Sequence, residues 1–448
     1  MRALIKKIVI AALVLEARLV LARTKPKVIA VTGSVGKTSA KDLLYTVVSS
    51  TFSAKKNEKS LNSEFGVPLT ILGLKTAWSS PMGWLLNLGF GIWRLGFPGE
   101  KYKFLVLELG ADKPGDIKTL SSWVRPKLGV ITGIGSEVPV HVEFFRDIEA
   151  LVSEKSELLR ALPEDGTAIV NRDDARAWEM REATRARVIS YGFASDANIR
   201  GDNLHTSYDD PLDSARGKKP KGINLRVDYA GKSVPVRLCG VLGKGHAYAA
   251  LAAFAVGANL GINVVTISDA LGRHKFTPGR LRILPGKNGS TIIDDTYNSS
   301  PSAVKLALET LHELELTVSP MADSQPQPRK VAVLGDMLEL GEYSEGEHRK
   351  VGTWIRGVAD VLVCVGEKAK WIGESAIEDG FDKGSVHEFG NSQEAGKFLS
   401  SFVLSGDMVL LKASQSVRLE RATEQLLEDP TKASELLVRQ EKEWRRKM

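Results

Sequence analysis

The sequence predicts an α/β protein with a doubly wound parallel sheet in a central domain and a second, Rossmann-like α/β domain after it. Short apolar runs rich in β-branched residues alternate with stretches of helical periodicity, first around residues 27–171 and again after residue 291. Such alternation is typical of parallel sheets covered by helices on both faces. The expected strands are residues 27–31, 103–109, 128–132, 166–171, 291–294, 330–334, 361–365 and 408–411.

The first strand and helix enclose a glycine loop. Residues 32–38 read TGSVGKT, and residues 39–48 have the apolar spacing of a helix. A strand, a glycine loop, GKT and a helix in this order indicate a phosphate-binding loop, in which backbone N–H groups and the helix N-terminus hold phosphates. Val31 stands where the longer form of the motif has its first glycine. The predicted nucleotide-binding residues are Thr32, Gly33, Ser34, Val35, Gly36, Lys37, Thr38 and Ser39.

Within this loop, Lys37 is expected to reach the terminal phosphates and Thr38 to ligate Mg²⁺. Polar side chains also stand at the ends of three later strands, namely Glu108, Thr132 and Asn171. Open α/β sheets bind their ligands at this edge. The alternative is a chance match in a polar loop, which the flanking strand and helix disfavour.

Composition restricts the class of protein. The chain has 448 residues, enough for two or three domains. Its two cysteines, Cys239 and Cys364, lie far apart, which fits a reducing, cytoplasmic compartment without a disulfide framework. The net charge of +7 is concentrated near the N-terminus, where residues 1–60 carry twelve Lys and Arg against three acids. This favours anionic lipid or nucleotide ligands, and no motif indicates a nucleic acid partner.

Residues 1–23 predict a helix with three alternative roles. The uninterrupted apolar run, residues 8–15, is shorter than the roughly 20 residues that a membrane span needs. An amphipathic helix on the inner membrane face is favoured over a helix packed on the protein body, and a true span is the third alternative. Residues 84–97 contain two Trp and are either a second membrane-surface contact or an apolar insertion packed on its neighbours.

The middle of the chain changes character. Residues 188–240 contain short alternating runs around a polar stretch, residues 206–222, which predict an antiparallel flap with a solvated insertion. Residues 243–260 predict an alanine-rich helix, and residues 276–280 (FTPGR) a hinge. We therefore predict an N-terminal amphipathic helix at 1–26, a central domain at 27–277 and a C-terminal domain at 278–448.

Ten motifs in order resemble the Mur ligase family, within it most closely the ligases that add D-alanyl-D-alanine to a UDP-muramoyl-tripeptide. They are TGSVGKTS (32–39), LNSEFGVPLTIL (61–72), LELGADKPGDI (107–117), HVEFF (141–145), EKSELL (154–159), GKGH (243–246), GRL (279–281), DDTYNSSPSA (294–303), GDMLELG (335–341) and KASQSVRLE (412–420). The resemblance implies an ATP- and Mg²⁺-dependent amide ligase of peptidoglycan precursor synthesis, acting through an acyl phosphate.

The residues fit that chemistry. A carboxylate that attacks a γ-phosphate brings two anions together, so the site must supply cations. Lys37 and a Mg²⁺ on Thr38 supply two, and Glu108 with His141 are expected to hold a second Mg²⁺. The resemblance implies that Lys155 carries a carbamate that helps hold this ion. The alternatives are a strand-end salt bridge for Glu108, a loop or capping histidine for His141 and a solvated helix lysine for Lys155.

Other site residues follow from the resemblance. Arg280 is expected to swing onto the transferring phosphate when the domains close, with a linker salt bridge as the alternative. Asp295 and Asn298 are expected to contact ribose and adenine, with Asx caps as the alternative. His246 is a predicted nucleotide-side contact, although the asparagine that follows it in the family is Ala247 here.

The substrate residues are less firmly defined. Asn62 is expected near the muramoyl-peptide or the phosphates, and Lys412 and Ser414 at the incoming peptide or phosphate. Gln415 stands where the family often has Arg. Three further positions, expected near the cleft, are Asp336, Glu339 and His348.

The largest departure from the family lies before the glycine loop. Relatives usually carry a separate UDP-binding domain there, whereas about 26 residues precede the strand that leads into the loop in this sequence, and none can be assigned to uridine. Two other functions therefore stay open. One is a Mur-like amide ligase on another carboxylate, such as poly-glutamate or a lipid-linked precursor. The other is a nucleotide-binding scaffold without ligase activity, which Ala247 and Gln415 would favour.

Overall fold

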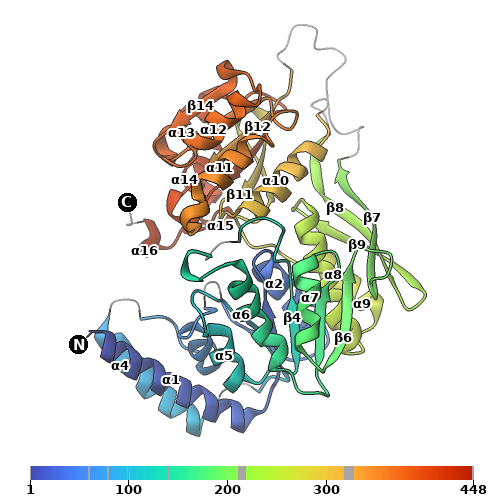
Figure 1. The fold of residues 1–448 in the computed structure, drawn as a ribbon, viewed down its shortest axis with the longest axis vertical. Coiled ribbons are helices and arrows are strands. Elements are labelled where there is room, and N and C mark those ends of the chain that lie inside the picture. The colour runs from blue at the N-terminus through green and yellow to red at the C-terminus, as the bar shows by residue number, and fades with distance from the viewer. Residues whose placement is uncertain are drawn as a thin grey trace.

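The structure is a computed structural model that describes residues 2–445 apart from 59–60, 78–79, 98, 100, 140–141, 210–217 and 317–326. Two sheets organise these residues, one in the N-terminal and one in the C-terminal part of the chain (Figure 1). The α/β class predicted from the sequence is confirmed.

The first sheet has nine strands. From β2 to β7 the pairing is parallel, and β8 and β9 continue the same sheet in antiparallel pairing. In spatial order the strands are β2 (Ala54–Lys56), β3 (Phe104–Glu108), β1 (Lys27–Thr32), β4 (Leu128–Ile131), β5 (Thr167–Asn171), β6 (Arg187–Gly192), β7 (Ile199–Tyr208), β8 (Pro220–Tyr229) and β9 (Lys232–Cys239).

Strand β1 shows why this sheet is wound on both faces. Its apolar residues alternate between two cores, with Ile29 and Val31 in one and Val28 and Ala30 in the other. Both faces are therefore buried, as a continuous apolar strand requires. The helices of this half of the chain are α1 (Arg2–Thr24), α2 (Lys37–Ser49), α3 (Gly66–Leu72), α4 (Pro81–Gly96), α5 (Asp116–Val124), α6 (Ile148–Arg160), α7 (Ala175–Glu179), α8 (Lys244–Asn259) and α9 (Val264–Gly272).

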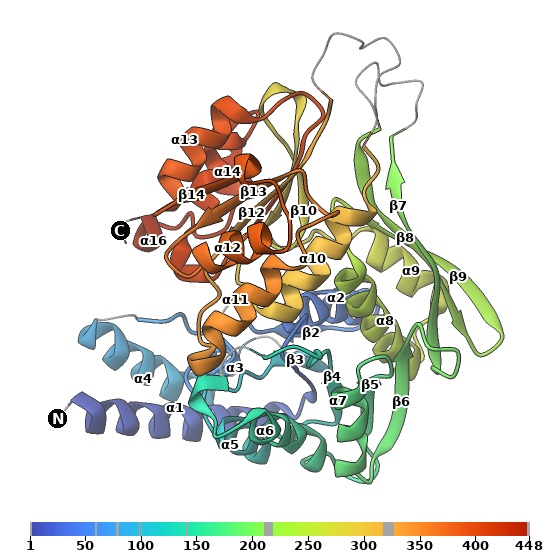
Figure 2. The same cartoon turned by 45° about the horizontal axis from the view of Figure 1, so that its top comes forward.

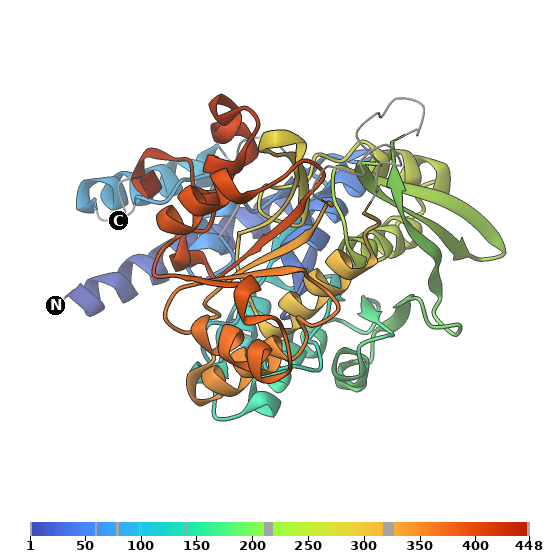
Figure 3. The same cartoon turned by 90° about the horizontal axis from the view of Figure 1, so that it is seen from above.

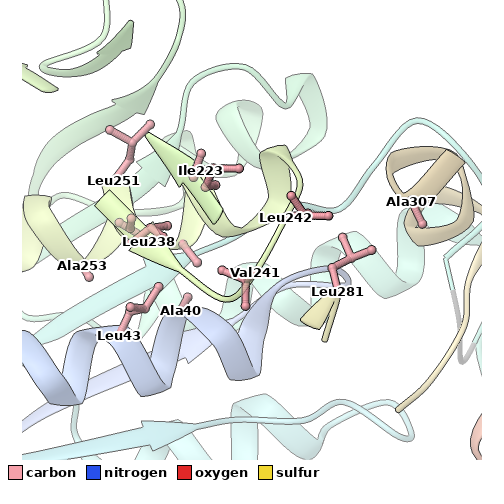
Figure 4. Close-up of a cluster of buried hydrophobic side chains, with 14 of the residues drawn as sticks. Ala40, Leu43, Ile223, Leu238, Val241, Leu242, Leu251, Ala253, Leu281 and Ala307 are labelled. Atoms are coloured by element: carbon pink, nitrogen blue, oxygen red, sulfur yellow. The ribbon is translucent and has the colours of Figure 1, made fainter. Parts of the chain in front are cut away.

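Helices α2 and α8 pack together on one face of the sheet. Figure 4 shows Ala40 and Leu43 of α2 below Leu251 and Ala253 of α8, with Leu238 of β9 beside them. All five side chains are buried. This packing fixes the direction of α2, and therefore the position of the glycine loop at its N-terminus.

The C-terminal sheet has six strands. Only the β10–β11 pair is antiparallel, and the others are parallel. Their order is β10 (Arg282–Pro285), β11 (Thr291–Asp295), β15 (Met408–Lys412), β12 (Lys330–Gly335), β13 (Val361–Val365) and β14 (Val386–Phe389). The helices are α10 (Pro301–Glu313), α11 (Ser344–Gly352), α12 (Lys370–Glu378), α13 (Ser392–Phe402), α14 (Glu420–Leu426), α15 (Ala433–Leu436) and α16 (Lys442–Arg445). Figure 2 shows α10 and α11 between the two sheets.

The predicted antiparallel pairing is confirmed for β7 to β9, and the rest of the flap prediction is corrected in two respects. β6 pairs in parallel with β5, and β7 to β9 extend the main sheet and do not form a separate flap. The strands are also longer than the sequence predicted. β7 continues to Tyr208 and β8 begins at Pro220, so both strands extend into the predicted polar insertion at 206–222. The centre of that insertion, residues 210–217, lies outside the described residues.

The N-terminal helix is packed on the protein body. Leu13, Ala17 and Val20 of α1 are buried, and α1 contacts α3 and α4. α4 begins where the Ser80 hydroxyl accepts a hydrogen bond from the N–H of Gly83, a regular N-cap. In the part of the chain that is described, no helix has the length and apolar character needed to cross a membrane.

Candidate active site

The glycine loop is pinned to the end of β4. The N–H groups of Ser34 and Val35 donate to the carbonyl of Gly133 at 2.8 and 2.9 Å. A Cβ on Gly33, which has φ +150°, would lie 2.0 Å from Oγ1 of Thr132. Only glycine therefore allows the loop to approach β4 this closely. The loop is thus held at the carboxyl edge of the sheet, as the sequence predicted.

Lys37 lies curled inside this loop. Its amine donates to the carbonyls of Gly33 (2.9 Å) and Ser34 (3.2 Å). Burial lowers the pKa of Lys37, while the carboxylate of Glu108 acts in the opposite direction. The buried Ser34 hydroxyl has no hydrogen-bond partner within the described residues. A partly buried cation, an unpartnered hydroxyl and the N-terminus of a 13-residue helix together fit phosphate groups.

Glu108 and Lys155 lie close to this loop and are buried. Glu108 ends β3, beside β1, and one of its carboxylate oxygens accepts from Nδ2 of Asn62 at 2.9 Å. Lys155, on α6, is 2% exposed, so the alternative of a solvated helix lysine is wrong. Burial, followed by the Lys37 cation, holds the pKa of Lys155 well below its usual value, and the acids Asp112, Glu154 and Glu108 oppose this.

The second predicted metal ligand is not described. His141 lies outside the described residues, so its distance to Glu108 stays a prediction. Within the described residues, no three His, Cys, Asp or Glu side chains gather as a metal site. The carboxylate of Asp112 is close enough to influence both Lys37 and Lys155. The sequence analysis missed Asp112, although it is an acid just beyond the end of a buried strand.

Arg280 joins the start of the C-terminal half to the glycine-loop helix. Its Nη2 donates to Oγ1 of Thr38 at 3.3 Å, and its guanidinium lies 4.1 Å from the centre of the Tyr297 ring. Its buried Nε has no partner in the described part of the chain. Arg280 also makes no ion pair with any described residue. The alternative of a linker salt bridge is therefore not observed.

His246 positions the backbone of this linker. Its Nε2 donates to the carbonyl of Arg280 at 2.8 Å, and its ring packs edge-on against Phe276. Burial lowers the pKa of His246, which favours the neutral ring. The contact that the structure records for His246 is therefore with the hinge. Its contact with a nucleotide stays a prediction.

Asp295 and Lys412 are buried together at the ends of β11 and β15, next to the partly exposed Asn298. The Lys412 amine donates to a carboxylate oxygen of Asp295 at 2.6 Å and to the carbonyl of Asn298 at 3.0 Å. The N-cap of the following helix is Ser300, so Asp295 is not an Asx cap. The residues predicted for nucleotide and for substrate thus lie together.

The remaining predicted positions lie in or contact the loop that follows β12. Oγ of Ser414 accepts from the N–H of Leu338. The carboxylate of Asp336 accepts from two backbone N–H groups at the start of α12, and His348 is wholly buried with Nε2 accepting from Met337. Asp336 and His348 therefore hold the chain after β12 in place. Glu339 has a left-handed backbone, with φ 63°.

A cavity of about 550 Å³ opens beside the glycine loop. Residues from both halves of the chain line it, including Gly36, Asn171, Asp173, Tyr248, Ser302 and Lys305. Tyr248 donates to a carboxylate oxygen of Asp173 at 2.9 Å. Sequence reasoning found Asn171 but missed Asp173 and Tyr248. Asp173 carried the same signal as Asn171, because it follows the end of a parallel strand.

Polar contacts hold the two halves of the chain together around this cavity. The buried carboxylate of Glu137 pairs with Lys350 and with Lys305, the second at 3.5 Å. The cavity beside the glycine loop therefore lies between the two halves of the chain.

Comparison with known proteins agrees with this architecture. Residues 31–257 match the family described as Mur ligase middle domain, and residues 279–415 match Mur ligase, glutamate ligase domain. The UDP-N-acetylmuramoyl-tripeptide–D-alanyl-D-alanine ligase of Mycobacterium leprae is 30% identical over 90% of this chain and 74% of its own length. The enzyme of the same name from Bacillus subtilis is 27% identical over 90% of this chain and 76% of its own length.

A solved structure supports the fold. The MurF ligase of Thermotoga maritima, determined in complex with ADP, is 24% identical and superimposes with a TM-score of 0.72 over 95% of this chain and 84% of that one. The resemblance inferred from the ten motifs is confirmed. The chain belongs to the Mur ligase family.

Proposed function

We propose that this protein is an ATP- and Mg²⁺-dependent amide ligase that adds D-alanyl-D-alanine to a UDP-N-acetylmuramoyl-tripeptide in peptidoglycan precursor synthesis. The observation that carries the proposal is the group of Lys37, Thr38 and the buried Glu108 and Lys155, with Arg280 reaching Thr38 from the C-terminal half. The curated relatives named for this reaction match the chain over 90% of its length.

The residues of the glycine loop would hold the nucleotide. Lys37 and the N–H groups at the start of α2 neutralise phosphate charge, and Thr38 would ligate Mg²⁺. When bound, ATP supplies the phosphoryl group that activates the substrate carboxylate as an acyl phosphate. Arg280 lies where it can stabilise charge on that group. The cavity beside Gly36 is large enough for a nucleoside, with Tyr248 and Asp173 in its wall.

A second Mg²⁺ would be held by Glu108, His141 and a carbamate on Lys155. The support for the carbamate is a lysine amine buried among acids and beside another cation. Carbon dioxide adds to a neutral amine with loss of one proton, so the side chain changes from a cation to an anion that a metal ion attracts. Asn62 donates a hydrogen bond to Glu108 and would hold that carboxylate in place near the substrate or the phosphates.

Asp295, Asn298 and Lys412 would meet the nucleotide or the incoming amine from the C-terminal half. This assignment rests on a central domain at 27–277 and a C-terminal domain at 278–448, preceded by the helix of residues 1–26. The change from one sheet to the other between β9 and β10 supports that division. Closure of the two domains would exclude water from an acyl phosphate.

A second candidate function is amide ligation on a lipid-linked carboxylate. The observation that favours it is the set of apolar side chains that α1 and α4 expose to solvent. The chemistry at the glycine loop would be unchanged, and only the carboxylate substrate would differ.

The test is phosphate release from ATP and Mg²⁺, with and without UDP-muramoyl-tripeptide and D-alanyl-D-alanine, with the product read by mass spectrometry. We expect one phosphate per pentapeptide formed and no turnover by a Lys37→Met variant. Phosphate release without this product would contradict the substrate assignment and direct the search to lipid-linked or glutamate substrates. If no carboxylate is turned over, the remaining interpretation is a nucleotide-binding scaffold without ligase activity.

A further inference from the structure

Helices α1 and α4 expose an unusual amount of apolar surface. Of the thirteen large apolar side chains that are exposed in the described residues, ten belong to these two helices and the residue that ends α4. Those on the α4 side are each 52–65% exposed. The ten residues are Ile8, Leu15, Leu19, Met82, Leu85, Leu86, Phe90, Ile92, Trp93 and Phe97. Concentration of this kind marks an interaction surface, whereas isolated exposed apolar residues need no explanation.

On each helix these side chains form a stripe. Met82, Leu86, Phe90, Trp93 and Phe97 recur every three or four residues, which places them on one face of α4. On α1, Ile8, Leu15 and Leu19 follow the same rule at intervals of seven and four. On both helices, therefore, one apolar face is not covered by any described part of the protein.

The opposite faces of the two helices pack against the protein body and against each other. Leu13, Ala17 and Val20 of α1 are buried in the core, and the two helices pack against each other. The contact between them is close: a Cβ on Gly91 of α4 would lie 1.8 Å from Oε2 of Glu16. The pair extends from the body of the molecule beside the N-terminus (Figure 3). Its exposed stripes are therefore free of the protein's own core.

The exposed charges on this pair are all positive among the side chains that the structure describes. They belong to Lys6, Lys7, Arg18, Arg23 and the partly exposed Arg94. The acid of α1, Glu16, is 7% exposed, and burial raises its pKa to about 6. α4 contains no acid. Apolar stripes flanked by cations fit a surface that is apolar inside and negatively charged outside.

We propose that α1 and α4 together dock this protein on an anionic phospholipid bilayer, lying in its interface. Apolar side chains would enter the acyl boundary, Trp93 and Phe97 would sit at headgroup level, and the cations would meet lipid phosphates. A second copy of the chain is a poorer occupant, because two copies of this face would set cations against cations. The docking surface is independent of the ligation proposed above, and its test does not use catalysis.

The test is co-sedimentation of the full chain with vesicles of phosphatidylglycerol and phosphatidylcholine in equal parts, compared with phosphatidylcholine alone. We expect binding to the anionic vesicles that weakens as salt is raised. Phe90→Glu should lower the partition coefficient about tenfold or more, because it removes a large apolar group and adds a repelled charge. Lys7→Gln and Arg18→Gln should each lower it about fivefold on anionic vesicles.

Val265→Glu is the matched control, because Val265 is 60% exposed but lies on α9. It should bind vesicles as the unchanged protein does. Brominated lipid should quench part of the tryptophan fluorescence, and Trp93→Phe should remove that part. All variants change exposed side chains, and thermal unfolding would verify that each is folded.

Three results would overturn the proposal. One is no binding of the folded chain to anionic vesicles at low salt. Another is equal loss of binding for Phe90→Glu and Val265→Glu. The third is a dimer, seen by analytical ultracentrifugation without lipid, that Phe90→Glu abolishes, because a second copy would then cover the face.

Discussion

Arg280 donates a hydrogen bond from Nη2 to Oγ1 of Thr38 at 3.3 Å, across 242 positions of the sequence. Thr38 is in the first turn of the glycine-loop helix, and Arg280 immediately precedes the C-terminal sheet. The guanidinium is held between Thr38 and the ring of Tyr297. Its cation is therefore held beside the first turn of the glycine-loop helix, where we propose that it meets a phosphate.

Arg280→Ala should lower the rate of phosphate release about 10²–10³-fold, as loss of one charge-stabilising donor does. Binding of ATP should change much less, because the loop amides and Lys37 remain. Stopped-flow phosphate release and equilibrium binding of a fluorescent ATP analogue measure the two effects. Arg273→Ala is a suitable control, since Arg273 is 81% exposed and lies near the same linker. Turnover within a few-fold of the unchanged enzyme would exclude this role.

Lys155→Ala should lose most activity, by about 10²–10³-fold, because the carbamate that we propose as a metal ligand cannot form. Formate or acetate should restore part of the rate by entering the space of the missing carboxylate. The unchanged enzyme should also slow in buffer depleted of carbon dioxide and recover with bicarbonate. Lys113→Ala, at a 60% exposed side chain, should show neither effect. A fully active Lys155→Ala enzyme would rule out the carbamate.

Glu137→Gln should weaken closure of the two domains. The Glu137 carboxylate is buried, but its partners Lys350 and Lys305 are about half exposed, so the loss should be about 1 kcal/mol. We expect kcat/KM for ATP to fall about fivefold and the radius of gyration, measured by small-angle X-ray scattering, to rise. Glu345→Gln removes a pair within α11 and should change neither quantity. If the two variants behave alike, the interdomain pairs do not control closure.

Asp294 should make stability depend on pH. Its carboxyl is wholly buried, and burial raises its pKa from 3.8 to about 6. The native state therefore holds the proton more tightly than the unfolded state, so this contribution is complete below about pH 4 and is lost as pH rises through about 6. Between these limits, the free energy of unfolding of the unchanged protein should fall by about 3 kcal/mol relative to Asp294→Asn. Urea unfolding measures this difference, and parallel pH profiles would refute it.

Much of the fold could be predicted because its signals are local. An apolar strand, a glycine loop and an amphipathic helix are each encoded in consecutive residues, so their order alone predicted residues 32–39 as a phosphate site. The same holds for Glu108, which ends a strand beside β1. The antiparallel extension was read less well, since β-pairing at 199–239 depends on partners that periodicity does not reveal.

The rest of the site depends on distant residues that meet only when the chain packs. The Lys412 amine reaches Asp295 across 117 positions, and Lys350 reaches Glu137 across 213. The role of α1 was open in the sequence for the same reason, because its apolar residues could lie on a membrane face, pack on the protein body or span a membrane. Packing decided that one face of α1 is buried and the other exposed.

By itself, the sequence determined the α/β class, the family and the glycine loop with Lys37 and Thr38, because short-range geometry and residue order carry that information. Tertiary structure decided that Lys155 is buried in the field of Lys37, that His246 holds the backbone of Arg280, and that Asp295 is paired with Lys412. The physical reason is that burial and charge pairing depend on which distant surfaces the two sheets bring together.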